Sequence, residues 1–200
     1  MKMHQFKLLQ KQNIISVLAI TGLVWLTGCQ CQQGLCGDSL TLVPVAFSDK
    51  QWTGVAVSGN ERIFVNYPRW SDEVPVSVAE LKNGKPVAFP DAAMNDWAPG
   101  KDPATHFVCV QAVYADDANT LWILDPASPK FQGVVPGGAK LVKVDLANNV
   151  IERTYFFSPD VATPTSYLND VRIDNRHGFA YISDSGAGAL VVLDLKTGDA

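Results

Sequence analysis

The sequence has little cysteine, few basic residues and no long apolar run. Four of the 200 residues are cysteine, and three of these fall within residues 29–36, too local a set to crosslink a whole domain. The strongest apolar run, Ile14 to Leu26, is too short to span a bilayer comfortably. The G-x-S-x-G, H-E-x-x-H, Walker and dinucleotide-binding motifs are missing, so no motif assigns a reaction.

The composition fits one globular domain with an acidic surface. Hydrophobic residues make up 47% and charged residues 18% of the chain, which excludes a disordered or coiled-coil protein. Residues 1–28 hold three of the 16 basic side chains and none of the 20 acidic ones, which leaves 13 basic and 20 acidic and a formal charge of −7. Because phosphate binding needs clustered Lys and Arg, we expect no nucleic-acid partner.

The N-terminus has the pattern of an export signal. Three lysines precede the apolar run, and Leu26-Thr27-Gly28-Cys29 follows it and resembles the lipobox of bacterial lipoproteins. We expect residues 1–28 to be a signal peptide and Cys29 to carry lipid that tethers the protein to a membrane. With Gln30 next, the outer membrane of the cell envelope is favoured. An ordinary signal peptide, giving an extracellular protein, and an uncleaved anchor are the alternatives.

Residues 29–45 are expected to be a tether rich in Cys, Gln and Gly. Cys31 and Cys36 could pair with each other in an oxidising envelope. A metal site is the alternative, although the spacing matches no zinc pattern. Cys109 lies in the apolar run FVCVQAV and is expected to be a small buried residue.

Three similar units follow each other at a constant spacing. Val55, Val113 and Val171 begin the first strand of each unit and are 58 residues apart, and the second strands end at Asn66, Asp125 and Asp184, which are 59 apart. Short strands repeated in this way predict an all-β fold, a β-propeller of four-stranded antiparallel blades. The blades are expected near residues 52–90, 107–157 and 167–200, within a partial propeller domain of residues 46–200.

The third unit lacks the fourth strand that the first two contain. Propellers close with about four to eight blades, so three blades do not make a ring. We therefore expect the chain to be part of a six-bladed parent, with the open faces exposed. A small three-sheet domain that dimerises is the alternative.

Polar residues at equivalent places predict the binding site. Thr53, Gln111 and Asn169 each stand two residues before the first valine of a unit. First strands line the channel of a propeller, so these side chains should ring its mouth together with Asp170. In the first long loop, Arg69 and Trp70 could stack on an aromatic or anionic ligand, or Trp70 could pack within the loop.

The runs FVNYPRW, LWILD and SYLNDVR, in this order, resemble the Yellow / major royal jelly protein family from about Trp52 to Leu195. The resemblance implies a secreted six-bladed propeller of about twice this length, in a family whose roles include ligand binding and dopachrome conversion. It favours a protein that binds a small ligand at the channel mouth and leaves open whether the protein is an enzyme. A dopachrome-conversion-like isomerase is one alternative.

The other alternative is a metal-dependent lactonase, by a more distant similarity to the gluconolactonase group. Members of that group bind a divalent cation in the channel through Asn, Asp and Glu oxygens. This similarity makes Asn169 a candidate ligand for a cation such as calcium.

Overall fold

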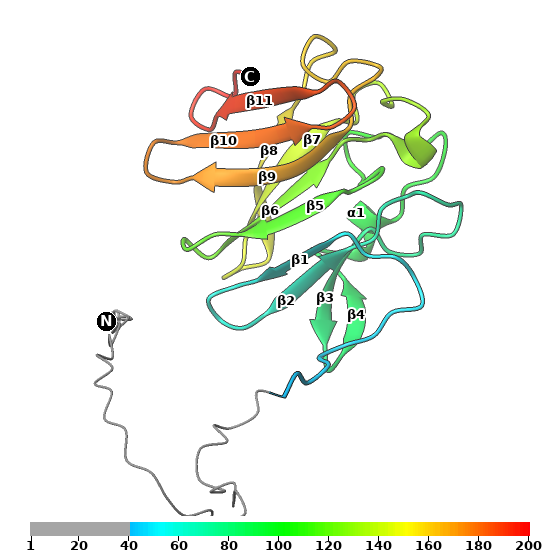
Figure 1. Cartoon of the computed structure of the whole chain (residues 1–200), viewed down its shortest axis with the longest axis vertical. Helices are drawn as coiled ribbons and strands as arrows, with labels where there is room; N and C mark the ends of the chain where they lie inside the picture. The colour runs from blue at the N-terminus through cyan, green and yellow to red at the C-terminus, as the bar shows by residue number, and fades with distance from the viewer. Residues whose placement is uncertain (1–40) are drawn as a thin grey trace, which may run out of the picture. The chain divides into compact units, whose positions relative to one another are not determined.

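The computed structural model describes residues 41–200, which are almost entirely antiparallel β-strands and their loops (Figure 1). The predicted signal peptide, the lipidation site Cys29, the Cys31 and Cys36 pair and most of the tether lie outside the described residues. In residues 41–200, no helix has the length and apolar character needed to cross a membrane.

The strands form three antiparallel sheets in chain order. The first sheet contains β1 (Gly54–Val57), β2 (Ile63–Asn66), β3 (Val78–Lys82) and β4 (Lys85–Ala88). The second contains β5 (Ala112–Ala115), β6 (Thr120–Asp125), β7 (Lys140–Asp145) and β8 (Val150–Phe156). The third, within the described residues, contains β9 (Leu168–Asp174), β10 (Phe179–Asp184) and β11 (Ala189–Asp194).

The all-β class and the three repeated sheets confirm the sequence prediction in its broad form. The largest shift is in β9, which begins at Leu168 and therefore includes Asn169, expected to precede the strand. The connection after β4 holds a short helix, α1 (Ala92–Asn95), whose Met94 backbone N–H donates to the Asp91 side chain. The loop after β6 holds a 3₁₀ turn, η1 (Pro129–Phe131).

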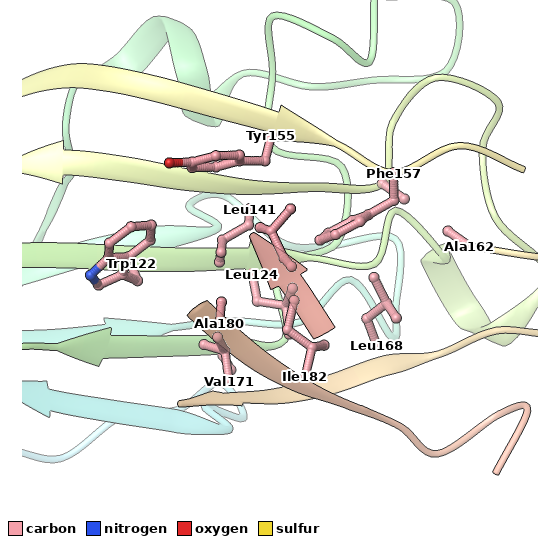
Figure 2. Close-up of a cluster of buried hydrophobic side chains, with 13 residues drawn as sticks. Trp122, Leu124, Leu141, Tyr155, Phe157, Ala162, Leu168, Val171, Ala180 and Ile182 are labelled. Carbon is pink, nitrogen blue, oxygen red and sulfur yellow. The ribbon is translucent and has the colours of Figure 1, made fainter. Parts of the chain in front are cut away.

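The sheets pack face to face and bury two apolar layers. One layer joins the first and second sheets and contains Phe64, Val78, Val113 and Ile123. The other joins the second and third sheets through Trp122, Leu124, Leu141, Leu168, Val171, Ala180 and Ile182 (Figure 2). In both pairs the first strands are neighbours, β1 beside β5 and β5 beside β9 (Figure 1). Neighbouring blades of a β-propeller have this arrangement.

Strand register identifies the equivalent positions in the three sheets. Val55 pairs with Val65, Val113 with Ile123 and Val171 with Ile182. Val113 and Val171 are buried against the preceding sheet, whereas Val55 is 68% exposed. The side of the first sheet that faces away from the second thus carries an uncovered valine at a position that is buried in both other sheets.

The opposite side of the third sheet shows the complementary pattern. Phe64, Trp122 and Tyr181 are equivalent, because they pair with Ala56, Tyr114 and Arg172 on the first strands. Phe64 and Trp122 are buried by the following sheet, but Tyr181 is 39% exposed. The outer faces of the first and third sheets therefore expose residues at positions that are buried where two sheets pack together.

Buried carboxylates hold the connecting segments that lead into the first strands. Asp125 accepts hydrogen bonds from the backbone N–H groups of Val108 and Cys109, at 2.7 and 2.9 Å. It also accepts from the Ala127 backbone N–H at 2.9 Å and from the ammonium group of Lys140 at 3.0 Å, and the Asp125 and Lys140 side chains are fully buried. Lys140 also donates to three backbone carbonyls, those of Pro103, His106 and Gly138. These bonds fix the segment that ends at Gln111.

Asp184 does the same for the third sheet, since its Oδ1 accepts from the backbone N–H of Tyr167 at 2.8 Å. It also caps the following turn through Gly186 and Ala187. The 59-residue spacing had aligned Asn66 with these aspartates, but register places Asn66 level with Leu124 instead. The second strands do end at Asn66, Asp125 and Asp184, as predicted. The turns that precede β2 and β6 have equal length, since Val57 pairs with Ile63 and Ala115 with Leu121, so β6 extends one residue further than β2.

Candidate functional site

Thr53, Gln111 and Asn169 form a continuous hydrogen-bonded row across the three sheets, which we call the polar row. Thr53 and Gln111 directly precede β1 and β5, and Asn169 lies near the start of β9. The Thr53 hydroxyl donates to the backbone carbonyl of Gln111 at 2.9 Å. The Gln111 Nε2 donates to Asn169 Oδ1 at 3.1 Å. The structure therefore brings together the three residues that the repeat placed at equivalent positions.

Residues behind the row fix its side chains. Asn66 Nδ2 donates to the Thr53 hydroxyl at 2.8 Å and to the Val110 carbonyl at 2.9 Å. The Tyr167 hydroxyl donates to Gln111 Oε1 at 2.8 Å. The indole N–H of Trp70 donates to the same Tyr167 hydroxyl at 2.7 Å. The row is thus held by a network that extends to the first long loop.

A groove of about 600 Å³ opens along the first strands, with the polar row on its wall. Asp170 and Arg172 also line it, together with apolar and backbone surface from Val55, Val57, Val113 and Tyr114. The guanidinium carbon of Arg172 lies 5.7 Å from the Tyr114 ring centroid. The groove therefore combines polar hydrogen-bonding groups with an apolar wall, as small-molecule sites do.

The charged groups of the groove are paired with each other. Asp170 Oδ1 accepts from Arg172 Nη1 at 2.8 Å and from the Val171 backbone N–H at 2.9 Å. Both side chains are more than half exposed, so solvent weakens their attraction. Arg172 keeps further N–H groups that are available to a ligand.

Trp70 belongs to an aromatic cluster rather than to the groove. Its ring lies 5.5 Å from Phe131, and Phe131 lies 4.8 Å from Tyr167, measured between centroids. Phe131 is exposed and has a φ of 57°, a backbone conformation that is strained for a bulky residue. Three separate connecting segments therefore meet at this cluster, and Tyr167 joins it to the polar row.

Arg69 points into the protein and contacts the segment before β5. Its Nε donates to the Val108 carbonyl at 3.0 Å, and its guanidinium carbon lies 5.2 Å from the Trp97 ring centroid. Burial lowers the pKa of Arg69. Arg69 is not among the residues that line the groove, so the structure does not join it to the polar row.

Cys109 is buried, as predicted, and carries a free thiol among the described residues. Burial, with a further contribution from the negative charge of Asp125, raises the pKa of Cys109 to about 12. A thiol with so high a pKa is a poor nucleophile at neutral pH. Burial likewise raises the pKa of Tyr167, which keeps its hydroxyl protonated and able to donate to Gln111.

The predicted calcium site is not supported by the donor set at the polar row. Within residues 41–200, no group of three or more His, Cys, Asp or Glu side chains lies close enough to hold a metal ion. Calcium requires about six to eight oxygen ligands. At the row, Asn169 Oδ1 already accepts from Gln111, and the carboxylate of Asp170 is engaged by Arg172. The residues present therefore do not fit this ion.

Three contributors to the site were missed by sequence reasoning. Tyr167 lies in the run SYLNDVR, where the neighbouring Asn169 and Asp170 are the stronger polar signals, and Asn66 has only the signal of a strand end. Phe131 had no sequence signal, because its position depends on the unusual backbone of the loop.

Comparison with known proteins supports the family resemblance over the second half of the chain. Residues 108–200 match the family model described as major royal jelly protein. A search of curated proteins gives no match. Among solved structures, apo AztD from Citrobacter koseri is similar at 12% identity and a TM-score of 0.28, over 74% of this chain and 45% of that chain. This chain thus spans less than half of that protein's length. The predicted resemblance to the major royal jelly protein family is therefore confirmed over residues 108–200.

Proposed function

We propose that this protein is an exported, lipid-anchored propeller that binds a small molecule in the groove beside the polar row. The observation that carries the proposal is the convergence of Thr53, Gln111 and Asn169. They come from three separate sheets, lie 58 residues apart in sequence and form one hydrogen-bonded wall. The same three residues line a groove, so the row also forms surface that a ligand can contact.

The experiment is calorimetric titration of the full chain with two series of aromatic compounds, amines and carboxylates of matched ring size. Saturable binding of a compound, reduced at least about tenfold in Gln111→Ala, supports the proposal. That factor is the value of one hydrogen bond to a ligand at about 1.4 kcal/mol. Absence of heat with every compound in both series contradicts it.

The proposed propeller has six blades, and residues 41–200 contribute three of its sheets. The support is the pair of uncovered end faces, in which Val55 and Tyr181 occupy positions that are buried elsewhere in the stack. In a closed ring, another sheet would cover each of these faces.

The proposed membrane anchor is the lipid on Cys29. It rests on the order of basic start, apolar run and lipobox-like residues. Expression in a bacterium with a labelled fatty acid tests it, and we expect label in the wild-type chain but none in Cys29→Ser. Equal labelling of both would contradict the anchor and leave ligand binding unaffected.

A further inference from the structure

We infer that the groove recognises a carboxylate or a similar anionic oxygen group, and not a divalent cation. This inference rests on the proposed function, since it names the chemistry of the ligand for the same groove. Its basis is the direction of each hydrogen bond in the network behind the polar row.

The direction is set by Trp70. An indole N–H can only donate, so the Tyr167 hydroxyl accepts from Trp70. In the structure this hydroxyl donates in turn to Gln111 Oε1. Gln111 must then present Oε1 to Tyr167, which leaves its Nε2 to donate to Asn169. Asn169 therefore presents Oδ1 to Gln111, and its Nδ2 carries the remaining hydrogens. The orientation of both amides follows from the bonds that Tyr167 makes to Trp70 and to Gln111.

The exposed side of the row consists mainly of N–H donors. Asn169 Nδ2 has no hydrogen-bond partner in residues 41–200, and Gln111 Nε2 has one hydrogen left after its bond to Asn169. Thr53 contributes little, because its hydroxyl accepts from Asn66 and donates to the Gln111 carbonyl. A ligand beside the row thus meets N–H groups, which bind oxygen acceptors and repel metal ions.

The charged pair of the groove, Asp170 and Arg172, is formally neutral, but its cation has donors to spare. Arg172 lines the groove and has N–H groups beyond the one bonded to Asp170. An incoming carboxylate can accept from this guanidinium, and such charge-assisted bonds are stronger than neutral ones. The formal charge of the whole chain is −4, so general attraction does not account for anion binding. If an anion binds in spite of this negative charge, the N–H donors of the groove must supply the attraction.

The apolar wall indicates the shape of a suitable probe. Tyr114 and Val57 line the same groove as the polar row, which suits a flat ring that carries one carboxylate. Benzoate is therefore the probe, benzylamine is its cationic counterpart with the same ring, and calcium is the test for a metal site.

The experiment titrates the full chain with each probe, in the wild type and in four variants. Asn169→Asp keeps the side-chain shape but replaces the two Nδ2 hydrogens with an anionic oxygen. Asn60→Asp makes the same charge change at an exposed turn position away from the groove. We expect benzoate to bind the wild type and Asn60→Asp equally within about twofold, and Asn169→Asp about tenfold to a hundredfold more weakly.

Arg172→Gln provides a second variant on the exposed surface, in case Asn169→Asp fails to fold by circular dichroism. The expected loss of benzoate affinity is about threefold to fivefold, since the group is largely solvated. Binding of benzylamine without benzoate, or calcium binding lost in Asn169→Ala, would overturn the inference while the binding function stands. Silence of all three probes would overturn the inference and, with the wider series, the function as well.

Discussion

Val113 and Val55 provide a matched pair for testing how the sheets pack. They hold the same position in successive units, but Val113 is 7% exposed and Val55 is 68% exposed. Replacing valine with alanine removes about two methylene equivalents, or about 1.6 kcal/mol when they are buried, and the cavity adds to this loss. We expect Val113→Ala to lower the free energy of unfolding by about 1.5–2.5 kcal/mol. For Val55→Ala, with about a third of its surface covered, we expect about 0.5 kcal/mol.

The comparison removes the effect of strand propensity, because both changes are Val→Ala in a first strand. Urea unfolding of the dilute full chain, followed by tryptophan fluorescence, measures both values. Equal losses at the two sites would refute the reasoning, since they would mean that the outer face of the first sheet is already covered in this chain.

Three other predictions follow from the same structure. Lys140→Met should destabilise the protein by about 3–5 kcal/mol in urea unfolding, because it leaves the Asp125 carboxylate buried without its cation; Asp125→Asn in the same chain should recover part of this loss, and no recovery would contradict the pairing. Hydrogen bonds from Arg62 lower the pKa of Glu80, so its stabilising contribution is present above the ordinary Glu pKa and is lost as the pH falls through the lowered value. Wild type should therefore lose more stability than Glu80→Gln between neutral and acidic pH, and parallel curves would disprove the link. Finally, Cys109, with a pKa of about 12, should resist iodoacetamide at pH 8 until urea is added, as mass spectrometry of its peptide would record; rapid native labelling would contradict its burial.

The arrangement of the strands could be predicted from the sequence because its signals are local. Alternating β-branched residues and turn residues recur at a fixed spacing, and each depends only on neighbours in the chain. The equivalence of Thr53, Gln111 and Asn169 followed from the same spacing, so their meeting in one row needed no knowledge of side-chain contacts.

The donor character of the site could not be predicted in this way. It depends on the bond between Trp70 and Tyr167, which are 97 residues apart, and an amide has no preferred direction until such a partner is known. Lys140 is a similar case. From sequence alone, a lysine at the start of a strand is predicted to be exposed. Its burial is favourable only because Asp125 and the carbonyls of Pro103, His106 and Gly138 bind its ammonium group.

The most direct test of the account is the behaviour of the side-chain amides during a benzoate titration, observed by NMR in ¹⁵N-labelled full chain. The account predicts that the Asn169 and Gln111 amide signals shift together and saturate at one dissociation constant. The amide of Asn148, bonded to Asp145 in an exposed turn, should not move. Unchanged signals from Asn169 and Gln111, or equal shifts at Asn148, would contradict the polar row as the ligand site.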